Sequence, residues 1–446
     1  MLVIGAGACG LVAALAARAA GAEVLVLERD RTPTGSTALS SGFIPAAGTR
    51  FQRAIGVVDD TPALLAADIM AKSQHGADAA EALRVARAVG PALEWLAAAH
   101  GIPFHVLEGF RYPGHSRLRM HAVPERTGAA LLARLLDAAA AADVQLVTAA
   151  QATGLFADPD GRIGGVRIAR PDGTQEDIAC TALVLACNGY GGAPALVRRH
   201  IPEMAEALYF GHAGNQGDAL RWGGELGAAV RDLGACQGHG GIAHPHGVLI
   251  TWALLMEGGI QVNTAGRRFW NEQEGYSEAA VAVLRQPGGI AFDIFDARLL
   301  ELGRTFADFR TAEAAGAVRQ AADIAGLASV CGLPAAALAA TLAEAAALAE
   351  RGGTDAFGRR FTGPALAPPY YAVRVTGALL HTQGGLVVDD DARVQRADGT
   401  ALPNLFAGGG AARGVSGGSI AGYLSGNGLL TAIAYGRLAG AAAARL

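Results

Sequence analysis

The sequence predicts an α/β protein in which a Rossmann-like nucleotide-binding domain carries an inserted α+β domain. A glycine-rich turn lies between a strand and a helix at the N-terminus, and a second glycine-rich segment links a strand to the last helix. From about residue 239 the pattern changes to short strands and long alanine-rich helices. We therefore expect residues 1–238 and 366–446 to form the nucleotide-binding domain and residues 239–365 to form the inserted domain.

The composition excludes several classes of protein. The 446 residues are 51% apolar, which is enough for more than one core. The net charge is −4 without a long basic run, so we expect no nucleic-acid partner. No segment has the ~18 apolar residues of a transmembrane helix, and no charged region precedes the first strand as in a signal peptide. These features predict a cytoplasmic protein.

The five cysteines show no metal-binding pattern. They form no C-x-x-C pair and no Cys/His spacing suited to zinc, and their scatter fits a reducing compartment. We expect no metal site and mostly small core-filling roles for Cys9, Cys180, Cys187, Cys236 and Cys331.

The secondary structure follows from periodicity and turn residues. The N-terminus reads as a strand over 1–4, a turn over 5–10, a helix over 11–20 and a strand over 23–28. A polar loop over 30–50 precedes a helical pattern over 61–100, and a second loop covers 101–124. Further helices are expected over 61–100, 127–142, 311–352 with a break at 332–334, and 428–445. Further strands are expected over 144–147 and 166–168 in a small meander, and over 182–186, 260–262, 387–389 and 404–407.

The glycine turn is a dinucleotide-binding fingerprint in its required context. Gly5 permits the tight turn, Gly7 allows close approach of a pyrophosphate, and Gly10 lets the helix pack on the strand. The helix that begins near Ala8 directs backbone N–H groups at the phosphates. Glu28 ends the next strand and would accept hydrogen bonds from ribose hydroxyls.

The segments around this turn favour FAD over NAD as the cofactor. After Glu28 comes a small, hydroxyl-rich loop suited to the pyrophosphate and ribityl chain. Near the C-terminus, a helix N-terminus would face the flavin pyrimidine and stabilise negative charge on it. No second strand-linked G-x-G-x-x-G exists for a nicotinamide cofactor. The FAD-contacting residues expected here are Arg29, Ser36, Thr37, Ser40, Ser41, Gly42, Gly408, Gly409, Gly426, Gly428 and Leu429.

Taken in order, the motifs resemble the fumarate reductase/3-ketosteroid dehydrogenase superfamily of flavoproteins over essentially the whole chain. Besides the fingerprint and the hydroxyl-rich loop, the segments that carry the resemblance are Leu185–Gly191, Gly214–Ala219, Gly266–Glu272, Asp355–Arg359, Thr382–Gly385, Ala407–Gly409 and Gly436–Gly440.

The resemblance implies a glutathione-reductase-type FAD domain with a catalytic cap domain. It implies hydride transfer between flavin N5 and a carbon β to an electron-withdrawing carbonyl, while a side chain moves the α proton. It adds Ala186, Asn188, Gly189 and Asp218 to the expected FAD contacts. Some members hold FAD covalently through an early histidine. Residues 29–50 contain none, so non-covalent FAD is expected.

Two tyrosines indicate the branch of the superfamily. Fumarate reductases have an arginine acid shortly after the R-F-x-N-E segment, and this chain has Tyr276 there. A second arginine of those enzymes is replaced by Tyr423. In 3-ketosteroid dehydrogenases the matching tyrosines act as the base and as the hydrogen-bond donor to the ketone. The Gly422–Gly426 segment also resembles tricarballylate dehydrogenases. A packed aromatic residue is the alternative at each position.

Other residues point toward a carboxylate. His381 and His244 resemble histidines that bind a substrate carboxylate in fumarate reductases, although a polar loop histidine would also fit. The loop Phe110–Arg119, which contains Tyr112, either reaches the substrate, with Tyr112 assisting the base, or lies on the surface.

The leading hypothesis is a flavin-dependent dehydrogenase that desaturates a cyclic ketone or keto acid. A donor to the ketone oxygen would stabilise the enolate, and a phenol with an ordinary pKa near ~10 becomes a base only in a favourable environment. The alternatives are an enoate reductase, a polycarboxylate dehydrogenase, or a flavin carrier without turnover. The partners expected are a small ketone or carboxylate substrate and an electron acceptor of unknown identity.

Overall fold

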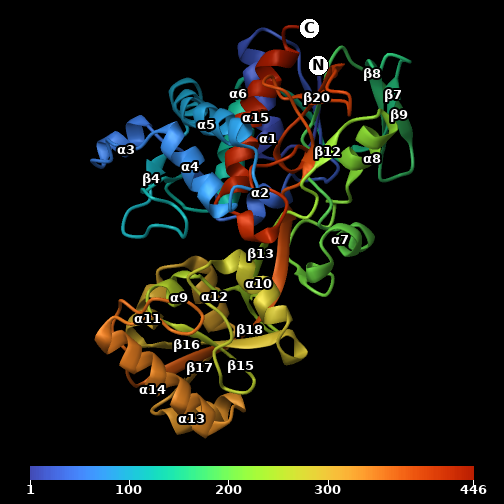
Figure 1. The fold of residues 1–446 in the computed structure, drawn as a ribbon. Helices are drawn as coiled ribbons and strands as arrows, with labels where there is room; N and C mark the ends of the chain where they lie inside the picture. Colours follow the sequence, from blue (N-terminus) through green and yellow to red (C-terminus); the bar gives the residue numbers. More distant parts are fainter. The chain divides into compact units, whose positions relative to one another are not determined.

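The computed structural model describes residues 1–446 and divides into two compact units (Figure 1). Unit 1 comprises Met1–Ile201, Gly211–Cys236 and His381–Leu446. Unit 2 comprises Pro202–Phe210 and Gln237–Leu380. The segment 239–365, expected as the inserted domain, falls within unit 2. That unit also takes in 366–380, because most of a long strand, β18, pairs with other strands of unit 2.

Unit 1 is built on a six-stranded sheet with the order β20-β21-β10-β1-β2-β6. β1 pairs in parallel with both β2 and β10, so that Leu2 lies opposite Leu25 and Leu183. The central strands are short apolar runs, as expected where both faces of a parallel sheet are covered. The strands of unit 1 are β1 (Leu2–Ile4), β2 (Leu25–Leu27), β3 (Ile44–Pro45), β4 (His105–Val106), β5 (Met120–Ala122), β6 (Gln145–Val147), β7 (Gln151–Ala157), β8 (Ile163–Ala169), β9 (Gln175–Ala179), β10 (Leu183–Leu185), β12 (Val230–Arg231), β19 (Gly385–Leu386), β20 (Arg393–Gln395) and β21 (Ala401–Ala407).

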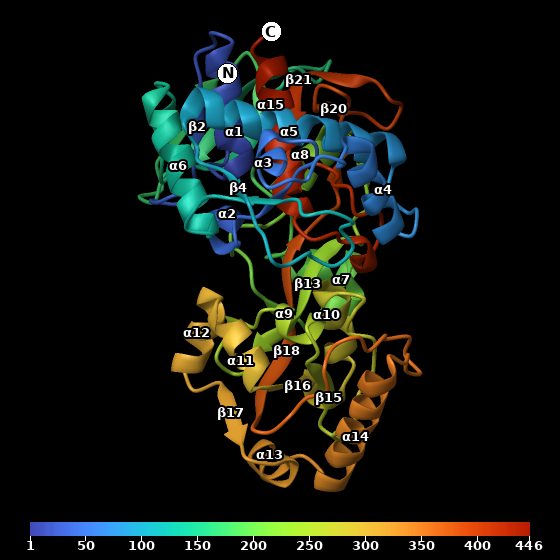
Figure 2. The same cartoon turned by 90° about the vertical axis from the view of Figure 1, so that its left-hand side faces the viewer.

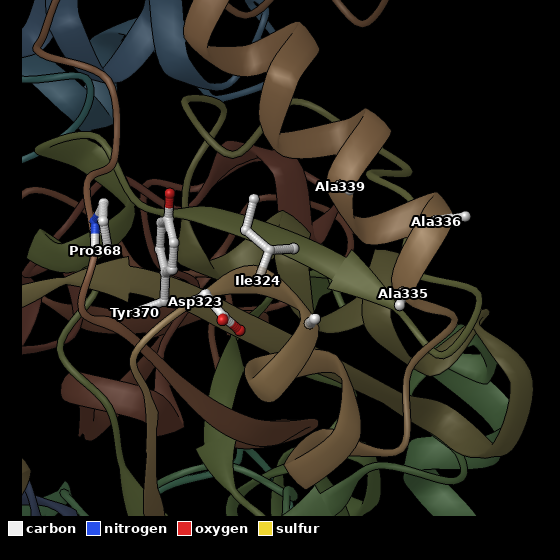
Figure 3. Close-up of a pocket in the computed structure, with 8 residues that line it drawn as sticks. Asp323, Ile324, Ala335, Ala336, Ala339, Pro368 and Tyr370 are labelled. Atoms are coloured by element: carbon white, nitrogen blue, oxygen red, sulfur yellow. The ribbon is translucent and has the colours of Figure 1, made fainter.

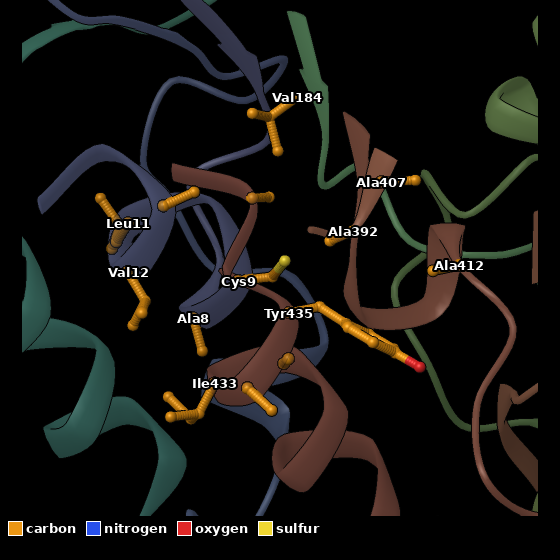
Figure 4. Packing of buried hydrophobic residues seen from close by; sticks show 14 of the residues in the cluster. Ala8, Cys9, Leu11, Val12, Val184, Ala392, Ala407, Ala412, Ile433 and Tyr435 are labelled. Atoms are coloured by element: carbon orange, nitrogen blue, oxygen red, sulfur yellow. The ribbon is translucent and has the colours of Figure 1, made fainter. Parts of the chain in front are cut away.

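The first and last helices of unit 1 pack against each other. A Cβ at Gly436 would lie 2.6 Å from the carbonyl oxygen of Cys9, so only glycine permits this approach. Figure 4 shows Cys9 and Tyr435 in the shared core beside strands of the sheet. The helices of unit 1 are α1 (Ala8–Ala19), α2 (Gly35–Leu39), α3 (Arg50–Ala54), α4 (Pro62–Lys72), α5 (Ala79–His100), α6 (Gly128–Ala141), α7 (Pro194–His200), α8 (Asp218–Glu225), η3 (Gly409–Ala411), η4 (Ile420–Gly422) and α15 (Asn427–Ala443).

Unit 2 is a mixed sheet with helices on both faces. Within β16, Phe292 and Ile294 pack into the core with α13 and α14, whereas Ala291 and Phe295 pack with α11 and α12. Figure 2 shows these helix pairs on opposite sides of the strands. The elements are β11 (Leu208–Tyr209), β13 (Cys236–Ala243), β14 (Val248–Leu249), β15 (Ile260–Asn263), β16 (Ile290–Asp296), β17 (Val318–Ala321), β18 (Tyr370–Thr382), η1 (Pro202–Met204), α9 (Ala253–Met256), α10 (Tyr276–Leu284), η2 (Pro287–Gly289), α11 (Ala297–Arg304), α12 (Ala307–Ala314), α13 (Ile324–Cys331) and α14 (Ala335–Arg351).

Several local expectations were wrong. The stretch 144–147 forms β6, which pairs in parallel with β2 instead of joining the meander β7-β8-β9. The helical pattern over 61–100 breaks into α4 and α5, and 311–352 contains the strand β17. No strand forms over 387–389, where Val388 makes only an isolated bridge to Val394, and the neighbouring strand β19 ends at Leu386. In each case pairing with a distant strand or a local turn overrides residue propensity.

None of the helices combines the length and the apolar character needed to cross a bilayer.

Candidate functional site

The glycine turn lies between β1 and α1, and other backbone segments of unit 1 pack closely against it. Gly5 has a φ of 106°, and a Cβ there would lie 2.5 Å from the carbonyl oxygen of Ala186, just after β10. A Cβ at Gly10 would lie 1.9 Å from the carbonyl oxygen of Gly5. The backbone of the protein therefore requires glycine at both positions.

Gly7 differs from these two glycines. Its φ of −80° suits any residue, and the only atom near a Cβ there would be the Thr37 hydroxyl oxygen, at 3.3 Å. The Thr37 hydroxyl accepts a hydrogen bond from the backbone N–H of Ala8 (3.0 Å), and α1 has no side-chain cap of its own. The protein's own packing thus does not require glycine at position 7. Close approach of an anionic group such as a dinucleotide pyrophosphate to the N-terminus of α1 would require it.

Glu28 connects the end of β2 to the glycine turn. Its carboxylate oxygens accept hydrogen bonds from the backbone N–H groups of Ala6 (2.9 Å) and Asp30 (3.0 Å). The residue is buried. Each carboxylate oxygen can accept a further bond, so Glu28 can hold the turn and still bind ribose hydroxyls.

The hydroxyl-rich loop forms α2 and meets residues far away in the sequence. The Ser36 hydroxyl accepts hydrogen bonds from the side-chain amides of Asn188 (2.7 Å) and Asn215 (3.2 Å). Ser40 donates to the Thr37 carbonyl oxygen (2.7 Å) and so closes the end of α2. The structure therefore brings the predicted residues Ser36, Thr37 and Asn188 into the neighbourhood of α1. Asn215 is an additional member that sequence reasoning missed.

Three of the other predicted FAD contacts in unit 1 are glycines that neighbouring atoms approach closely. A Cβ added at Gly189 would lie 2.0 Å from the Thr382 hydroxyl oxygen. One at Gly408 would lie 2.6 Å from the Cys9 sulfur, and one at Gly42 would lie 2.8 Å from the Thr127 backbone. Gly409 has a φ of 57°. Arg29 donates to the Gly214 carbonyl oxygen (2.9 Å), and Asp218 begins α8 and pairs with Arg221 (3.0 Å). Ser41 is exposed and Leu429 is half-buried.

The start of α15 brings two candidate catalytic residues together. Gly426 is the N-cap, with a φ of 87°, and no side chain caps the helix. A Cβ at Gly428 would lie 2.9 Å from Nε2 of His381, so glycine makes room for that ring. The rings of His381 and Tyr423 lie edge to face, 5.7 Å apart. Burial lowers the pKa of His381 to about 4, which keeps the imidazole neutral.

In unit 2, Tyr276 is the first residue of α10. Its ring stacks on that of His239, with 5.0 Å between centroids and 21° between planes. His239 accepts a hydrogen bond at Nδ1 from the backbone N–H of Gly241 (3.0 Å), and burial lowers its pKa to about 3. Sequence reasoning missed His239. Its place within a glycine-rich strand, Gly238-His239-Gly240-Gly241, is the available signal.

A buried polar network supports the segment before Tyr276. Glu272 is paired with Arg268 and Arg359 and accepts a hydrogen bond from the backbone N–H of Gln261 (2.9 Å). Trp252 donates its indole N–H to the Glu272 carbonyl oxygen (3.1 Å) and meets the His239 ring edge to face. These bonds hold Arg268 and Glu272, the latter four residues before Tyr276, to the rest of unit 2.

The two remaining predicted residues are His244 and Tyr112. His244 follows β13 five residues after His239, which along an extended strand is roughly 16 Å. The structure therefore does not place His244 beside Tyr276. In unit 1, Tyr112 packs edge to face on Phe43 and Phe110. Its loop is anchored to the α15 approach, because His115 Nε2 lies 2.9 Å from the Ser425 carbonyl oxygen.

A hollow of about 570 Å³ in unit 2 contains none of the predicted residues (Figure 3). Tyr370 and Ile324 form one wall, and alanines of α14 form another. Apart from Asp323 and the Tyr370 hydroxyl the lining is apolar, and we assign it no catalytic role.

The sheet order, the glycine turn with its acid and the glycine N-caps of α1 and α15 define a dinucleotide-binding protein. Residues 1–429 match the model of the family described as FAD binding domain, and the chain belongs to that family. FAD is therefore its cofactor class.

Individual relatives refine this assignment. The chain is 28% identical to an NADH:fumarate oxidoreductase of Klebsiella pneumoniae over all of its own length, but it spans only 47% of that relative. It is 26% identical to a 4-oxocyclohexanecarboxylate 2-dehydrogenase of Sinomonas cyclohexanicum, over 91% of this chain and 86% of that one.

Two solved structures resemble the whole chain. One is a flavocytochrome c3 fumarate reductase in an open conformation, with a TM-score of 0.83, 26% identity and 78% of its chain covered. The other is a 3-ketosteroid-Δ4-(5α)-dehydrogenase from Rhodococcus jostii, with a TM-score of 0.79, 26% identity and 96% covered. These findings confirm the predicted superfamily and fold class. The chain is a flavin-dependent CH–CH oxidoreductase of the fumarate reductase/3-ketosteroid dehydrogenase superfamily.

Proposed function

We propose that the protein desaturates a cyclic ketone that carries a carboxylate, at the carbons α and β to the ketone. The observation that carries the proposal is a tyrosine at the first position of α10, stacked on a neutral histidine, where fumarate reductases are expected to have an arginine acid. FAD, when bound, supplies the acceptor for the hydride that leaves the β carbon. The products are the conjugated enone and a proton on the base.

Tyr276 is the proposed base. Tyr276 is the first residue of α10, and the N-terminus of a helix carries the positive end of the helix dipole. The stacked His239 is neutral and accepts a hydrogen bond at Nδ1, so its remaining ring proton is on Nε2. In the proposed reaction the phenolate of Tyr276 removes the α proton of the ketone.

Tyr423 and His381 are proposed to bind the two polar ends of the substrate. The buried Tyr423 donates its hydroxyl proton to the ketone oxygen and so stabilises the developing enolate. His381, in edge-to-face contact with Tyr423, donates to the carboxylate. The Sinomonas relative, named for a cyclic keto acid, supports a substrate with both groups.

The second candidate is a reductase of an unsaturated carboxylate. The Klebsiella relative and the flavocytochrome structure are both named for fumarate, which favours this reading. The arginine acid expected for that reaction is absent at position 276, which argues against it.

An anaerobic substrate panel tests the proposal. We expect 4-oxocyclohexanecarboxylate to bleach the yellow protein, cyclohexanone to bleach it more slowly, and cyclohexanecarboxylate to leave it oxidised. Only a ketone makes the α proton acidic enough for a tyrosine base. Absorbance at the flavin maximum gives the rates. Reoxidation of the reduced protein by fumarate, together with no bleaching by any ketone, would establish the reductase instead.

A second expectation is that FAD is held without a covalent bond. Residues 29–50 contain no histidine that could be attached to the flavin. Acid precipitation should therefore release the yellow colour into the supernatant, where mass spectrometry should identify intact FAD. Colour that remains in a washed pellet would show a covalent link through another residue.

A further inference from the structure

A chain of buried hydrogen bonds ends on His381. The Asn427 side-chain amide donates to the Ser416 hydroxyl (3.0 Å), and this hydroxyl donates to the carbonyl oxygen of the Gln383 side chain (3.0 Å). The Gln383 amide nitrogen lies 3.2 Å from Nδ1 of His381. Gln383, Ser416 and Asn427 are at most 3% exposed, so water does not compete for these bonds.

The direction of these bonds determines which nitrogen of His381 carries the proton. An amide nitrogen only donates, and a serine hydroxyl has a single proton. Because Ser416 receives a proton from Asn427, its own proton is directed to Gln383, and the Gln383 N–H then points at His381. Nδ1 must accept this bond, so the ring proton lies on Nε2.

The competing arrangement is disfavoured. Nδ1 of His381 also lies 3.3 Å from the Thr382 carbonyl oxygen. In the competing tautomer the proton is on Nδ1 and is donated to this oxygen. The Gln383 N–H would then face another N–H, and one buried donor would lose its acceptor. A neutral ring, as burial ensures, has only one proton to place.

The opposite edge of the ring faces α15. Its Cε1 and Nε2 atoms lie against Gly428, and the ring meets that of Tyr423 edge to face. Nδ1, on the other edge of the ring, has two hydrogen-bonding neighbours, the Gln383 amide and the Thr382 carbonyl oxygen.

We propose that Gln383, Ser416 and Asn427 are positioning residues that hold His381 in the Nε2–H tautomer, so that the ring always presents a donor to an oxygen of the substrate. The inference rests on the proposed function, in which His381 binds the carboxylate. A carboxylate only accepts hydrogen bonds, so a lone pair on Nε2 would repel it. The network thus selects an anionic oxygen without placing a charge on His381.

The tautomer can be observed directly in the holoenzyme labelled with ¹⁵N-histidine. The ¹⁵N shifts of His381, assigned by comparison with His381→Gln, should show a protonated Nε2 and an unprotonated Nδ1 from pH 6 to 9. In the isosteric Gln383→Glu variant the carboxylate accepts from Nδ1, so the proton should move there or the ring should become doubly protonated. A wild-type ring protonated on Nδ1, or shifts that do not change in Gln383→Glu, would overturn the proposal.

Kinetics test the consequence for the substrate. In Gln383→Met, KM for 4-oxocyclohexanecarboxylate should rise roughly 5- to 30-fold while kcat changes less than about threefold, because a binding donor is lost and the base is intact. KM for cyclohexanone should not change. The matched control Gln151→Met, at an exposed position of β7, should behave as wild type.

The two proposals fail in different ways. If no ketone reduces the flavin, the proposed function fails, and the NMR result alone decides the tautomer. If His381 has the expected tautomer but Gln383→Met leaves KM for the keto acid unchanged, the network does not serve substrate binding and this inference is wrong.

Discussion

Replacing Tyr276 by phenylalanine should slow reduction of the flavin by a ketone substrate by roughly 10²–10⁴, the usual effect of removing a positioned acid–base group. This corresponds to about 3–5 kcal/mol in the activation barrier. The ring remains stacked on His239, so the packing of α10 should be preserved. FAD content and substrate affinity should change little, because the lost oxygen acts on the proton and not on the cofactor. Stopped-flow absorbance under anaerobic conditions measures the rate and the affinity in one titration.

Tyr370→Phe is the matched control. Tyr370 belongs to the same unit, but it faces the apolar hollow instead of His239. Its loss of a hydroxyl should leave the reduction rate within about twofold of wild type. A Tyr276→Phe protein that is reduced at the wild-type rate by every ketone that bleaches the flavin would exclude the proposed mechanism.

Replacing Gly7 by valine should produce folded protein that lacks FAD. A Cβ at position 7 would have only the Thr37 hydroxyl oxygen within 4 Å, at 3.3 Å, so we expect the fold to tolerate the substitution. The same side chain would stand at the N-terminus of α1, where the pyrophosphate is expected to bind. We expect FAD occupancy to fall roughly tenfold or more, equivalent to at least about 1.4 kcal/mol of binding free energy. The ratio of flavin to protein absorbance measures it, and circular dichroism reports the fold.

Two further variants distinguish loss of the site from loss of the fold. Gly154→Val changes a strand glycine with no atom within 4 Å of a Cβ, and it should remain yellow. Gly10→Val would collide with the Gly5 carbonyl and should unfold or aggregate. A Gly7→Val protein with full FAD content would show that the pyrophosphate binds elsewhere.

The sequence alone was sufficient for the features that depend on neighbouring residues. The first strand, the glycine turn and the helix that follows were predicted close to their observed bounds, because each is specified by local periodicity and by glycine. The acid Glu28 follows from its spacing after the turn. The same reasoning identified Tyr276 and Tyr423 as candidates, although the roles of both remain proposals.

Features that depend on contacts between distant residues could not be predicted. The strand β17 lies in an alanine-rich stretch that reads as helix, and it forms because its backbone pairs with β18. β6 joins the parallel sheet because its backbone pairs with the edge of β2.

The candidate site shows the same limit. His244 stays a predicted carboxylate-binding residue, whereas the ring that stacks on Tyr276 is that of His239, which no motif indicated. The donors that orient His381 come from residues up to 46 positions away in sequence, and only the fold brings them into hydrogen-bonding distance. Hydrogen bonds act over about 3 Å, whereas sequence patterns carry no information on which distant segments approach that closely. The sequence therefore determined which side chains are available for the chemistry, and the tertiary structure decided which of them meet.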